Sequence, residues 1–327
     1  MKLAIVILNW NGQKLLEQFL PSVVSYSKNA EIYIADNAST DNSVEFVTTH
    51  YPEITIIKNK VNGGYAKGYN DALKHIKADI YCLLNSDIEV TENWLTPIIS
   101  EFQKDDNIAA MQPKILDYKD KSKFEYAGAG GGFIDKYGYP YCRGRIFNSI
   151  ETDLKQYNDT KNIFWASGAC LFIKAEIFHD LNGFDEDYFA HQEEIDLCWR
   201  IQNINKQIKY VGTSTVYHVG GATLDTQNPR KTYLNFRNSL FNLVKNLPKN
   251  KGFGIIFIRL SLDGIAGVKY LLEGKPLHTI AILKSHVSFY ANLFKMLKKR
   301  TSDSKNKTYY TTKSIVWNYF VKGKKVY

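Results

Sequence analysis

The segment CLLNSDIEV, at residues 82–90, places a carboxylate where a buried strand should end. Its apolar run stops at Asn85-Ser86-Asp87, and a second acid, Glu89, follows. A carboxylate at such a place loses hydration, which is unfavourable unless a partner offsets the loss. A helix N-terminus, a nest of backbone N–H groups or a metal ion can be that partner. Asp87 is therefore the first candidate functional residue.

Three further apolar runs end in polar side chains in the same way. Any one of these groups is explained as a turn residue that satisfies backbone groups. Open parallel sheets, however, bind ligands at the carboxyl ends of their strands, and four polar strand ends together indicate such a site. The groups are Asn9-Trp10-Asn11, Asp36-Asn37, Lys58-Asn59 and Asn85-Ser86-Asp87.

The elements that must position these groups alternate between strand and helix. Short apolar runs are typical of strands buried on both faces, and here they alternate with segments of helical spacing, which predicts a parallel sheet covered on both faces. Ser39 or Thr40 is expected to cap the second helix and Thr91 the fourth. The predicted strands are 3–9, 31–36, 54–58 and 79–85, and the predicted helices are 13–27, one through Val47, one from Gly63-Gly64 to Ile76, and one after Thr91.

The pattern changes after residue 107. A Gly/Tyr/Arg-rich stretch, 126–145, is predicted to be a loop region. The fold class is therefore α/β, with one domain at 1–247 (halves 1–107 and 108–247) and a basic amphipathic helical extension at 248–327. Strands are predicted at 108–116 and 164–174 with two short ones within 208–221, and helices at 193–203 and 228–247, with two or three more from residue 253.

The composition bounds the class of protein. With 44% hydrophobic and 23% charged residues, the 327-residue chain is an ordinary globular protein and not a disordered one. Its four cysteines form no CxxC pair, which argues against a zinc knuckle or a redox motif. The start, MKLAIVILNWNG, is predicted to be a strand and not a signal peptide. A reducing, cytoplasmic location is expected.

The charge is uneven along the chain. Residues 1–240 carry 25 Lys+Arg and 30 Asp+Glu, whereas residues 241–327 carry 17 and 3. A basic tail suggests an anionic partner, either nucleic acid or a phospholipid surface. Segments 253–272 and 277–300 mix apolar and basic residues and are predicted to lie on the cytoplasmic face of an anionic membrane. The alternatives are packing on the catalytic domain and homodimer formation.

The glycine-rich loops that commonly bind phosphate are missing. The run Gly128–Phe133 lacks the sixth-place glycine of a dinucleotide fingerprint and follows no clean strand. Neither a Walker A loop nor the glycine-rich loop of a sugar nucleotidyltransferase occurs. A divalent cation held by carboxylates is another way to bind a diphosphate, and Asp87 is placed for it.

Seven segments, taken as an ordered set, resemble glycosyltransferases of family 2. These enzymes have the GT-A fold, and within them the chain resembles the rhamnosyltransferase-like branch that builds bacterial surface polysaccharides. The resemblance covers roughly residues 1–245. The segments are VILNWNG (6–12), IADNASTDNS (34–43), NGGYAKGYNDAL (62–73), LLNSDIEV (83–90), SGACLFIKAEIF (167–178), GFDEDYFAHQEEIDLCWR (183–200) and YHVGGAT (217–223).

The resemblance implies a donor site. Asp36 would hydrogen-bond the nucleobase, and Asn85-Ser86-Asp87 occupies the place of the DxD motif, with an amide instead of its first acid. Asp87 would bind Mg²⁺ or Mn²⁺. His218 stands where some relatives have another metal contact, although a lone His is often only hydrogen-bonded within a loop. The other implied donor-site positions are Asn9, Asn11, Asn37, Lys58, Gly64, Ser86, Gly168 and Arg230.

The resemblance also implies a catalytic base at the start of the helix 193–203. Acids at a helix N-terminus are common because they complement the dipole. Relatives, however, carry Glu-Asp here, and the second acid is the base. That position is Glu194, with Glu193 as the alternative, while Asp196 is expected to orient or cap. Trp165 is expected to stack on a sugar or lie in the core, and Arg143 and Arg145 to meet phosphates or remain solvated.

The implied reaction is metal-dependent, inverting transfer of a sugar from a UDP- or dTDP-sugar to a hydroxyl of a glycan or lipid-linked acceptor. One rival is a polyprenyl-phosphate glycosyl synthase of the same fold. The other is a non-catalytic protein that binds a sugar nucleotide or nucleic acid. Acids at both Asp87 and Glu194 argue against the second rival, so no nucleic-acid partner is expected.

Overall fold

The computed structural model describes residues 1–220, 228–248, 252–300 and 309–327. Within them, thirteen strands form two sheets. The strands are β1 (Leu3–Asn9), β2 (Glu31–Asp36), β3 (Thr55–Lys58), β4 (Ile80–Asn85), β5 (Ile88–Val90), β6 (Ile108–Asp117), β7 (Gly132–Ile134), β8 (Pro140–Cys142), β9 (Arg145–Ile146), β10 (Ser149–Ile150), β11 (Thr160–Asn162), β12 (Cys170–Lys174) and β13 (Gln207–His218).

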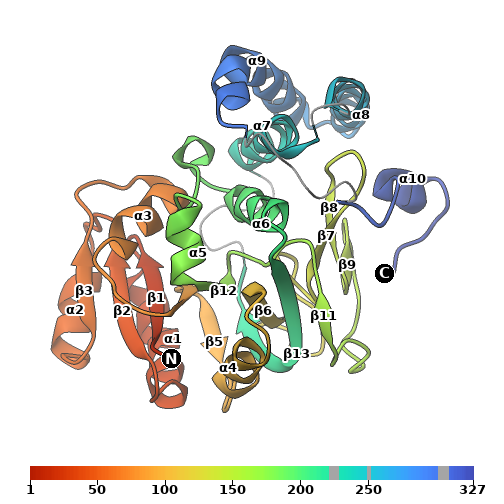
Figure 1. Ribbon diagram of the computed structural model, residues 1–327. Helices are drawn as coiled ribbons and strands as arrows, with labels where there is room; N and C mark the ends of the chain where they lie inside the picture. Colours follow the sequence, from red (N-terminus) through yellow and green to blue (C-terminus); the bar gives the residue numbers. More distant parts are fainter. Residues whose placement is uncertain (221–227, 249–251, 301–308) are drawn as a thin grey trace.

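The large sheet has the order β11-β13-β6-β12-β4-β1-β2-β3, and β5 pairs with β13 (Figure 1). Strands β4, β1, β2 and β3 are parallel, as predicted, so their carboxyl ends lie at one edge. Strand β6 is also parallel to β13. Between these two parallel groups, β12 runs antiparallel to both β4 and β6. The sheet is therefore mixed but mostly parallel.

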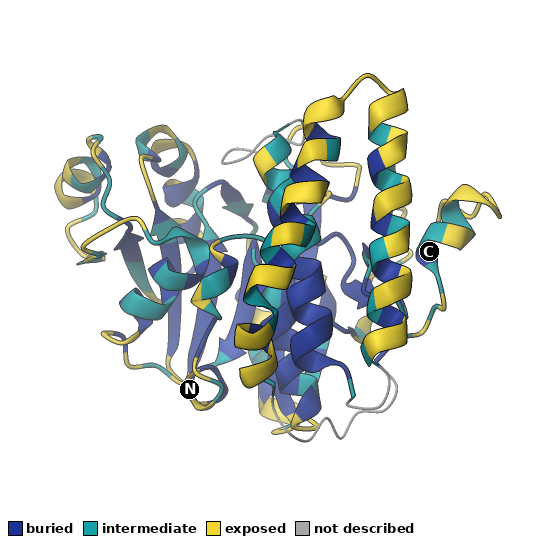
Figure 2. Ribbon diagram, turned by 90° about the horizontal axis from the view of Figure 1, so that it is seen from above, coloured by how far each residue is buried: buried dark blue, intermediate teal, exposed yellow. Residues whose placement is uncertain are grey.

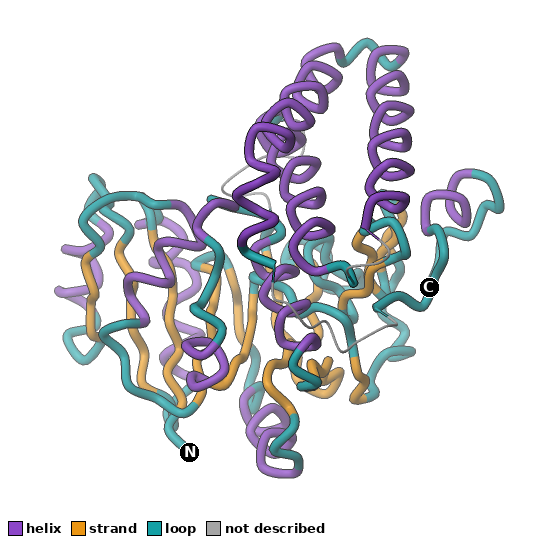
Figure 3. The backbone as a smooth tube through the Cα atoms, turned by 45° about the horizontal axis from the view of Figure 1, so that its top comes forward, coloured by secondary structure: helices purple, strands orange, loops and turns teal. Residues whose placement is uncertain are grey.

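Helices cover both faces of this sheet (Figure 3). Along β1, alternate side chains pack on opposite faces of the sheet, because successive side chains of a strand point in opposite directions. Leu3, Ile5 and Ile7 join one apolar cluster, and Ala4 and Val6 join the other. The helices are α1 (Gln13–Tyr26), α2 (Ser43–His50), α3 (Gly64–Leu73), α4 (Leu95–Lys104), α5 (Ala175–Asp180), α6 (Glu193–Asn203), α7 (Pro229–Asn246), α8 (Gly252–Leu272), α9 (Pro276–Lys298) and α10 (Ile315–Phe320), with a short 3₁₀ helix η1 at Glu186–Tyr188.

Two predictions of strand structure were wrong. Residues 208–218 form part of one long strand, β13, and not two strands. Its pairing with β6 shifts register between Val211 and Thr215, so an irregularity replaces the expected turn. The predicted loop region 126–145 contains β7, β8 and the start of the small sheet β10-β9-β8-β7. Glycines there give a weak strand signal. The strands form nevertheless, because each pairs with its neighbour in the sequence.

The predicted helix caps were also wrong. Helix α2 begins after Asn42, and α4 begins after Trp94. Thr91 instead donates its hydroxyl hydrogen to the carbonyl oxygen of Thr215, at 2.7 Å. A tertiary acceptor on β13 thus outcompetes the local capping position.

The three long helices near the C-terminus pack together. Helices α8 and α9 form a hairpin beside α7, above the sheet in the view of Figure 1. Seen from above, exposed residues run along α8 and α9, whereas α7 is mostly buried (Figure 2). Among the residues described, none of the helices is long and apolar enough to span a bilayer.

Candidate active site

The carboxyl ends of β1 and β2 are joined by buried polar side chains. The Asn9 amide donates to Asp36 Oδ1 at 3.4 Å and to Ser39 Oγ at 3.1 Å. Asn11 adopts φ 51°, and its Oδ1 accepts the backbone N–H of Thr40 at 2.7 Å. The 39–40 segment is therefore held against β1 and does not cap α2. This network fixes the Asp36 carboxylate at the sheet edge.

A second network joins the ends of β2 and β3 to α3. Asn37 donates to Asn62 Oδ1 at 2.9 Å and to the carbonyl of Gly64 at 3.1 Å. It accepts from Asn59 at 3.2 Å. Lys58 ends β3 with an exposed side chain, next to Asp36 in the strand register. Asn59 and Asn62 thus organise this edge together with the predicted residue Asn37.

Gly64 lets the loop after η1 approach the first turn of α3. Its φ is +78°, and an added Cβ would lie 2.5 Å from the carbonyl oxygen of Phe189. That oxygen accepts the N–H of Tyr65 at 2.9 Å. The backbone of Phe189 therefore approaches Gly64 at a distance that only glycine allows.

Three ionisable side chains form a chain of contacts at the turn after β4. Asp87 and His218 are buried, and His218 Nε2 lies 3.1 Å from Asp87 Oδ1. His218 Nδ1 lies 3.4 Å from Oε1 of a third buried residue, Glu125. Burial alone would lower the pKa of His218, but Glu125 and Asp87 outweigh it and raise the pKa to about 10. Glu125 was not identified from the sequence, because it falls at the edge of the region predicted to be a loop.

These residues fit a divalent cation that displaces the proton of His218, because a His binds a metal through a deprotonated ring nitrogen. The 3.1 Å between Asp87 Oδ1 and His218 Nε2 matches neighbouring ligands of an octahedral ion with bonds of ~2.1 Å. A carboxylate on the other ring nitrogen, here Glu125, is the usual support of a metal-bound His. In the described part of the chain, no three His, Cys, Asp or Glu side chains could hold a metal by themselves. Diphosphate oxygens and water would have to complete the shell.

The first turn of α6 carries two neighbouring carboxyl groups. Glu193 is buried, whereas Glu194 is half-buried and lies on the side of Gly168, whose added Cβ would be 3.8 Å from Glu194 Cβ. Burial raises the pKa of Glu194 to about 7. Burial and the neighbouring Glu194 raise the pKa of Glu193 well above its usual range. At neutral pH, Glu194 is the group of the pair that can accept a proton.

Gly168 and Ala169 connect the two halves of the edge. The Tyr65 hydroxyl donates to the Gly168 carbonyl at 2.7 Å, and the Asn85 N–H donates to the Ala169 carbonyl at 3.0 Å. The segment that lies beside Glu194 is thus hydrogen-bonded to α3 and to the end of β4. The structure brings together the carboxylate predicted to bind metal and the carboxylate predicted to act as base at one edge of the sheet.

Residues 4–181 match the Glycosyl transferase family 2, which is more than half of the chain. The chain belongs to glycosyl transferase family 2. The predicted GT-A fold and glycosyltransferase activity are both confirmed.

Similar proteins narrow the branch of the family. The chain is 23% identical over 233 residues to the N-acetylglucosaminyl-diphospho-decaprenol L-rhamnosyltransferase of Mycobacterium tuberculosis, an alignment that covers 66% of this chain and 75% of that protein. It is 22% identical over 221 residues to the rhamnosyltransferase WbbL of Escherichia coli, covering 65% of this chain and 82% of WbbL. The predicted rhamnosyltransferase-like branch is confirmed.

The fold extends to solved structures of lower identity. The mannosyltransferase PcManGT from Pyrobaculum calidifontis, solved in complex with GDP-Man and Mn²⁺, superposes with a TM-score of 0.54 at 14% identity. The match covers 88% of this chain and 87% of that one. At this identity the likeness concerns the fold.

In this glycosyltransferase, α7 holds the loop that leads to Glu194. The Asn238 amide donates to the carbonyl oxygens of Tyr188 (3.1 Å), Ala190 (3.0 Å) and His191 (2.7 Å). Phe189, His191 and Gln192 all have positive φ, a strained conformation that needs such support. Asn238 was missed because an amide on an amphipathic helix carries no sequence signal of its tertiary role.

We expect Asn238→Ala to lower kcat by about 10- to 100-fold, because a shift of ~1 Å in a reacting group costs up to about 10² in rate. Steady-state kinetics would measure the effect, with KM for the donor changing less than kcat. The matched control is Asn292→Ala, which removes one amide-to-carbonyl bond (2.8 Å, to Ser288) within α9. Equal kinetics for both variants would contradict the role of Asn238.

Three other predicted positions are Asp196, Arg230 and the end of the YHVGGAT segment. Asp196 is buried against Arg200 and Lys245, which outweigh burial and hold its pKa well below the usual range, so it anchors α6 to α7. Arg230 lies over the Phe189 ring, beside the first turn of α3, with 5.2 Å from guanidinium carbon to ring centroid. Residues 221–223 of the YHVGGAT segment lie outside the described residues.

The expectation that Arg143 and Arg145 remain solvated was wrong. Both side chains are buried and therefore not solvated. Arg143 pairs with Asp159 at 2.8 Å, and Arg145 donates to the Tyr126 carbonyl at 2.9 Å. Trp165 is buried and donates to the Phe133 carbonyl, as expected for a core residue.

Proposed function

We propose that this glycosyltransferase moves a sugar from a nucleoside diphosphate sugar to a hydroxyl of a glycan or lipid-linked acceptor, with inversion at the anomeric carbon. The observation that carries the proposal is the position of Glu194 beside Gly168. This carboxylate is half-buried, adjacent to the segment proposed to border the donor sugar, and its pKa is raised to about 7. A base with that pKa suits proton removal at neutral pH.

The chain's own groups have separate tasks in this proposal. Asp36, fixed by Asn9, accepts a hydrogen bond from the nucleobase, and Asn11, Asn37 and Lys58 border the nucleotide. Glu194 takes the acceptor proton at its carboxylate oxygen while the hydroxyl attacks from the face opposite the leaving diphosphate. A single displacement of this kind inverts the configuration.

Mg²⁺ or Mn²⁺ would be held by Asp87 and His218, with Glu125 orienting the imidazole. When bound, the ion supplies positive charge that stabilises the departing diphosphate. Asn85 and Ser86 are placed to contact the donor from the same turn, and Gly168 leaves room for its sugar. Arg230 is proposed to add positive charge on the phosphate side. The solved relative with GDP-Man and Mn²⁺ supports this assignment by likeness of fold.

The test is a transfer assay with a panel of UDP-, dTDP- and GDP-sugars, with Mg²⁺, Mn²⁺ or EDTA present. We expect one donor to be hydrolysed or transferred only with metal, and the anomeric proton of the product, read by NMR, to show inversion. Retention of configuration, or equal turnover in EDTA, would refute the corresponding part of the proposal.

The pH dependence follows from the same carboxylate. The pKa of Glu194 is raised to about 7, so it is protonated and inactive as a base below that pH and ionised above it. We expect log kcat to rise with a slope near one below pH ~7 and to level off above it. Saturating kinetics from pH 5.5 to 9 would measure this profile. A kcat that is flat across pH 5.5–7 would argue that another group is the base.

A further inference from the structure

Helix α8 exposes an apolar side along its whole length. Phe253 and Leu272, at its two ends, are 88% and 83% exposed. Phe257, Ile265 and Val268 lie between them and are also exposed. Large apolar side chains are rarely grouped on a solvated surface without a partner.

Two of the charges that interrupt α8 in sequence do not lie on this side, whereas Lys269 is exposed and pairs with Glu273. Arg259 and Asp263 are buried and pair with each other at 2.7 Å. The Tyr139 hydroxyl donates to the same carboxylate at 2.9 Å, and Arg259 donates to the Gly138 carbonyl at 3.1 Å. The ion pair thus fastens α8 to the small sheet, and its burial leaves Lys269 as the one exposed charge of this helix.

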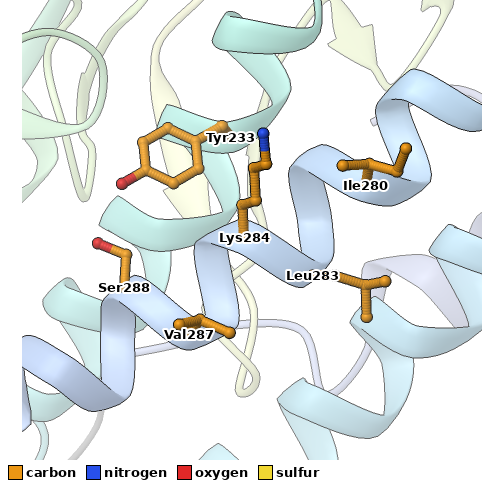
Figure 4. Close-up of a pocket in the computed structure, with 6 residues that line it drawn as sticks. All are labelled: Tyr233, Ile280, Leu283, Lys284, Val287 and Ser288. Carbon is orange, nitrogen blue, oxygen red and sulfur yellow. The ribbon is translucent and has the colours of Figure 1, made fainter.

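Helix α9 continues the apolar surface and borders it with lysines. Leu283, Val287 and Phe294 are exposed on the side opposite the buried stripe that includes Ser285 and Phe289. A shallow groove of about 460 Å³ lies between α9 and α7, lined by Tyr233, Ile280, Leu283, Lys284, Val287 and Ser288 (Figure 4). Its lining is apolar apart from the hydroxyls and the Lys284 ammonium group. We call the exposed side chains of α8 and α9 together the outer face.

The charge around the outer face has one sign. Lys284 and Lys298 are exposed on α9. Of the three acids in residues 241–327, Asp263 is buried against Arg259, Glu273 pairs with Lys269, and Asp303 lies outside the described residues. A twofold dimer through this face would bring two copies of the same positively charged surface together, which is unfavourable. An anionic lipid surface complements both the apolar side chains and the lysines.

The outer face is mechanically linked to the active site. On the inner side of α9, Lys295 pairs with Asp187 at 2.6 Å, and Lys299 pairs with Asp187 at 2.7 Å and with Asp185. Asp185 caps η1 and Asp187 lies within it, directly before the loop that Asn238 holds beside α3 and α6. A surface that covers α9 would therefore lie close to the loop that positions the base.

We propose that the outer face docks on an anionic phospholipid bilayer, with α8 and α9 lying in the plane of the interface. Apolar side chains enter the headgroup region, and the lysines contact phosphate. This proposal concerns where the enzyme sits and stands independently of the reaction proposed above.

The test is co-flotation of the full-length protein with phosphatidylcholine vesicles that contain or lack phosphatidylglycerol, at 50 and 500 mM NaCl. We expect binding only to the anionic vesicles, weakened at least tenfold by high salt. The double variant Phe257→Ser/Phe294→Ser is expected to lower the partition coefficient tenfold or more, and so is Lys284→Glu/Lys298→Glu.

Matched controls change the same residue types elsewhere. Leu154→Ser removes a side chain that is 78% exposed on another surface, and Lys28→Glu reverses an exposed charge between α1 and β2. Both should bind as the unaltered protein does. Equal binding to neutral and anionic vesicles, or unchanged binding in both double variants, would overturn the proposal. So would a lipid-free dimer in sedimentation that the Phe257→Ser/Phe294→Ser variant dissociates.

Discussion

Replacing Glu194 with Gln is expected to lower kcat by about 10²–10⁴, the usual contribution of a general base. The amide keeps the size of the carboxyl group but cannot accept a proton. The first turn of α6 places this half-buried group beside Gly168. Donor affinity should change little. Steady-state kinetics and a thermal-shift titration with the donor would separate the two effects.

Glu193→Gln is the matched control for this substitution. Burial and the neighbouring Glu194 raise the pKa of Glu193 well above its usual range, which favours its neutral form, and Gln is a neutral group of the same shape. Its effect on kcat should therefore be much smaller. If Glu193→Gln is the inactive variant instead, the roles of the two residues are exchanged. If neither substitution slows transfer, the base lies elsewhere in the protein.

The pH dependence of kcat gives a second test of Glu194 as the base. In the Glu194→Gln variant, the residual rate should no longer rise through pH ~7, because the titrating group is gone. Loss of both the rate and the pH dependence distinguishes a missing base from a displaced one. Asn238→Ala, which displaces the loop but keeps the carboxylate, should retain the pH dependence at a lower rate.

The polar residues at the sheet edge were predictable because each lies at the end of its strand or directly after it in the sequence. Strands buried on both faces read as continuous apolar runs, and the polar residues that follow them stand out. Asn9, Asp36 and Asp87 were identified on this basis, and the structure places Asn9 in contact with Asp36. The resemblance to family 2 added Glu194 and His218, whose own sequence surroundings are ordinary.

Residues whose roles depend on distant partners were not predictable. Glu125 precedes the small sheet and meets His218 only because β13 runs beside β6 along its whole length. Asn238 reaches three carbonyl groups about fifty positions earlier in the chain. Neither contact leaves a periodic or compositional trace, so only the tertiary structure identifies these two residues.

The tail shows a different limit of sequence reasoning. Arg259 and Asp263 interrupt the apolar sequence of α8. Their four-residue spacing puts them on one side of α8, and the structure shows that this side is buried. A hydropathy pattern alone does not tell which side of a helix faces the protein. In α8 the side that carries Arg259 and Asp263 faces the protein, so these two charges are absent from the exposed side.

Replacing Asp87 with Ala is expected to abolish transfer and metal-dependent donor binding while the fold is retained. Asp87 is the buried acid at the end of β4 and the proposed ligand of Mg²⁺ or Mn²⁺. Without it, His218 and Glu125 remain as a pair, but the proposed carboxylate ligand of the ion is lost. In a thermal-shift experiment, the melting temperature of the unaltered protein should rise with nucleotide and Mn²⁺ together, and that of the variant should not.

Two further variants separate loss of the metal site from loss of structure. Asp87→Asn keeps the shape of the side chain and a hydrogen bond to His218 but removes the charge, so it should fold normally and still fail to bind metal. Glu125→Gln leaves both proposed ligands in place and weakens only the support of His218 Nδ1. It should lower metal affinity by about 10- to 100-fold and be rescued by excess Mn²⁺. Full activity of Asp87→Asn at limiting metal would refute the proposed site, because an uncharged ligand alone cannot hold a divalent ion against water.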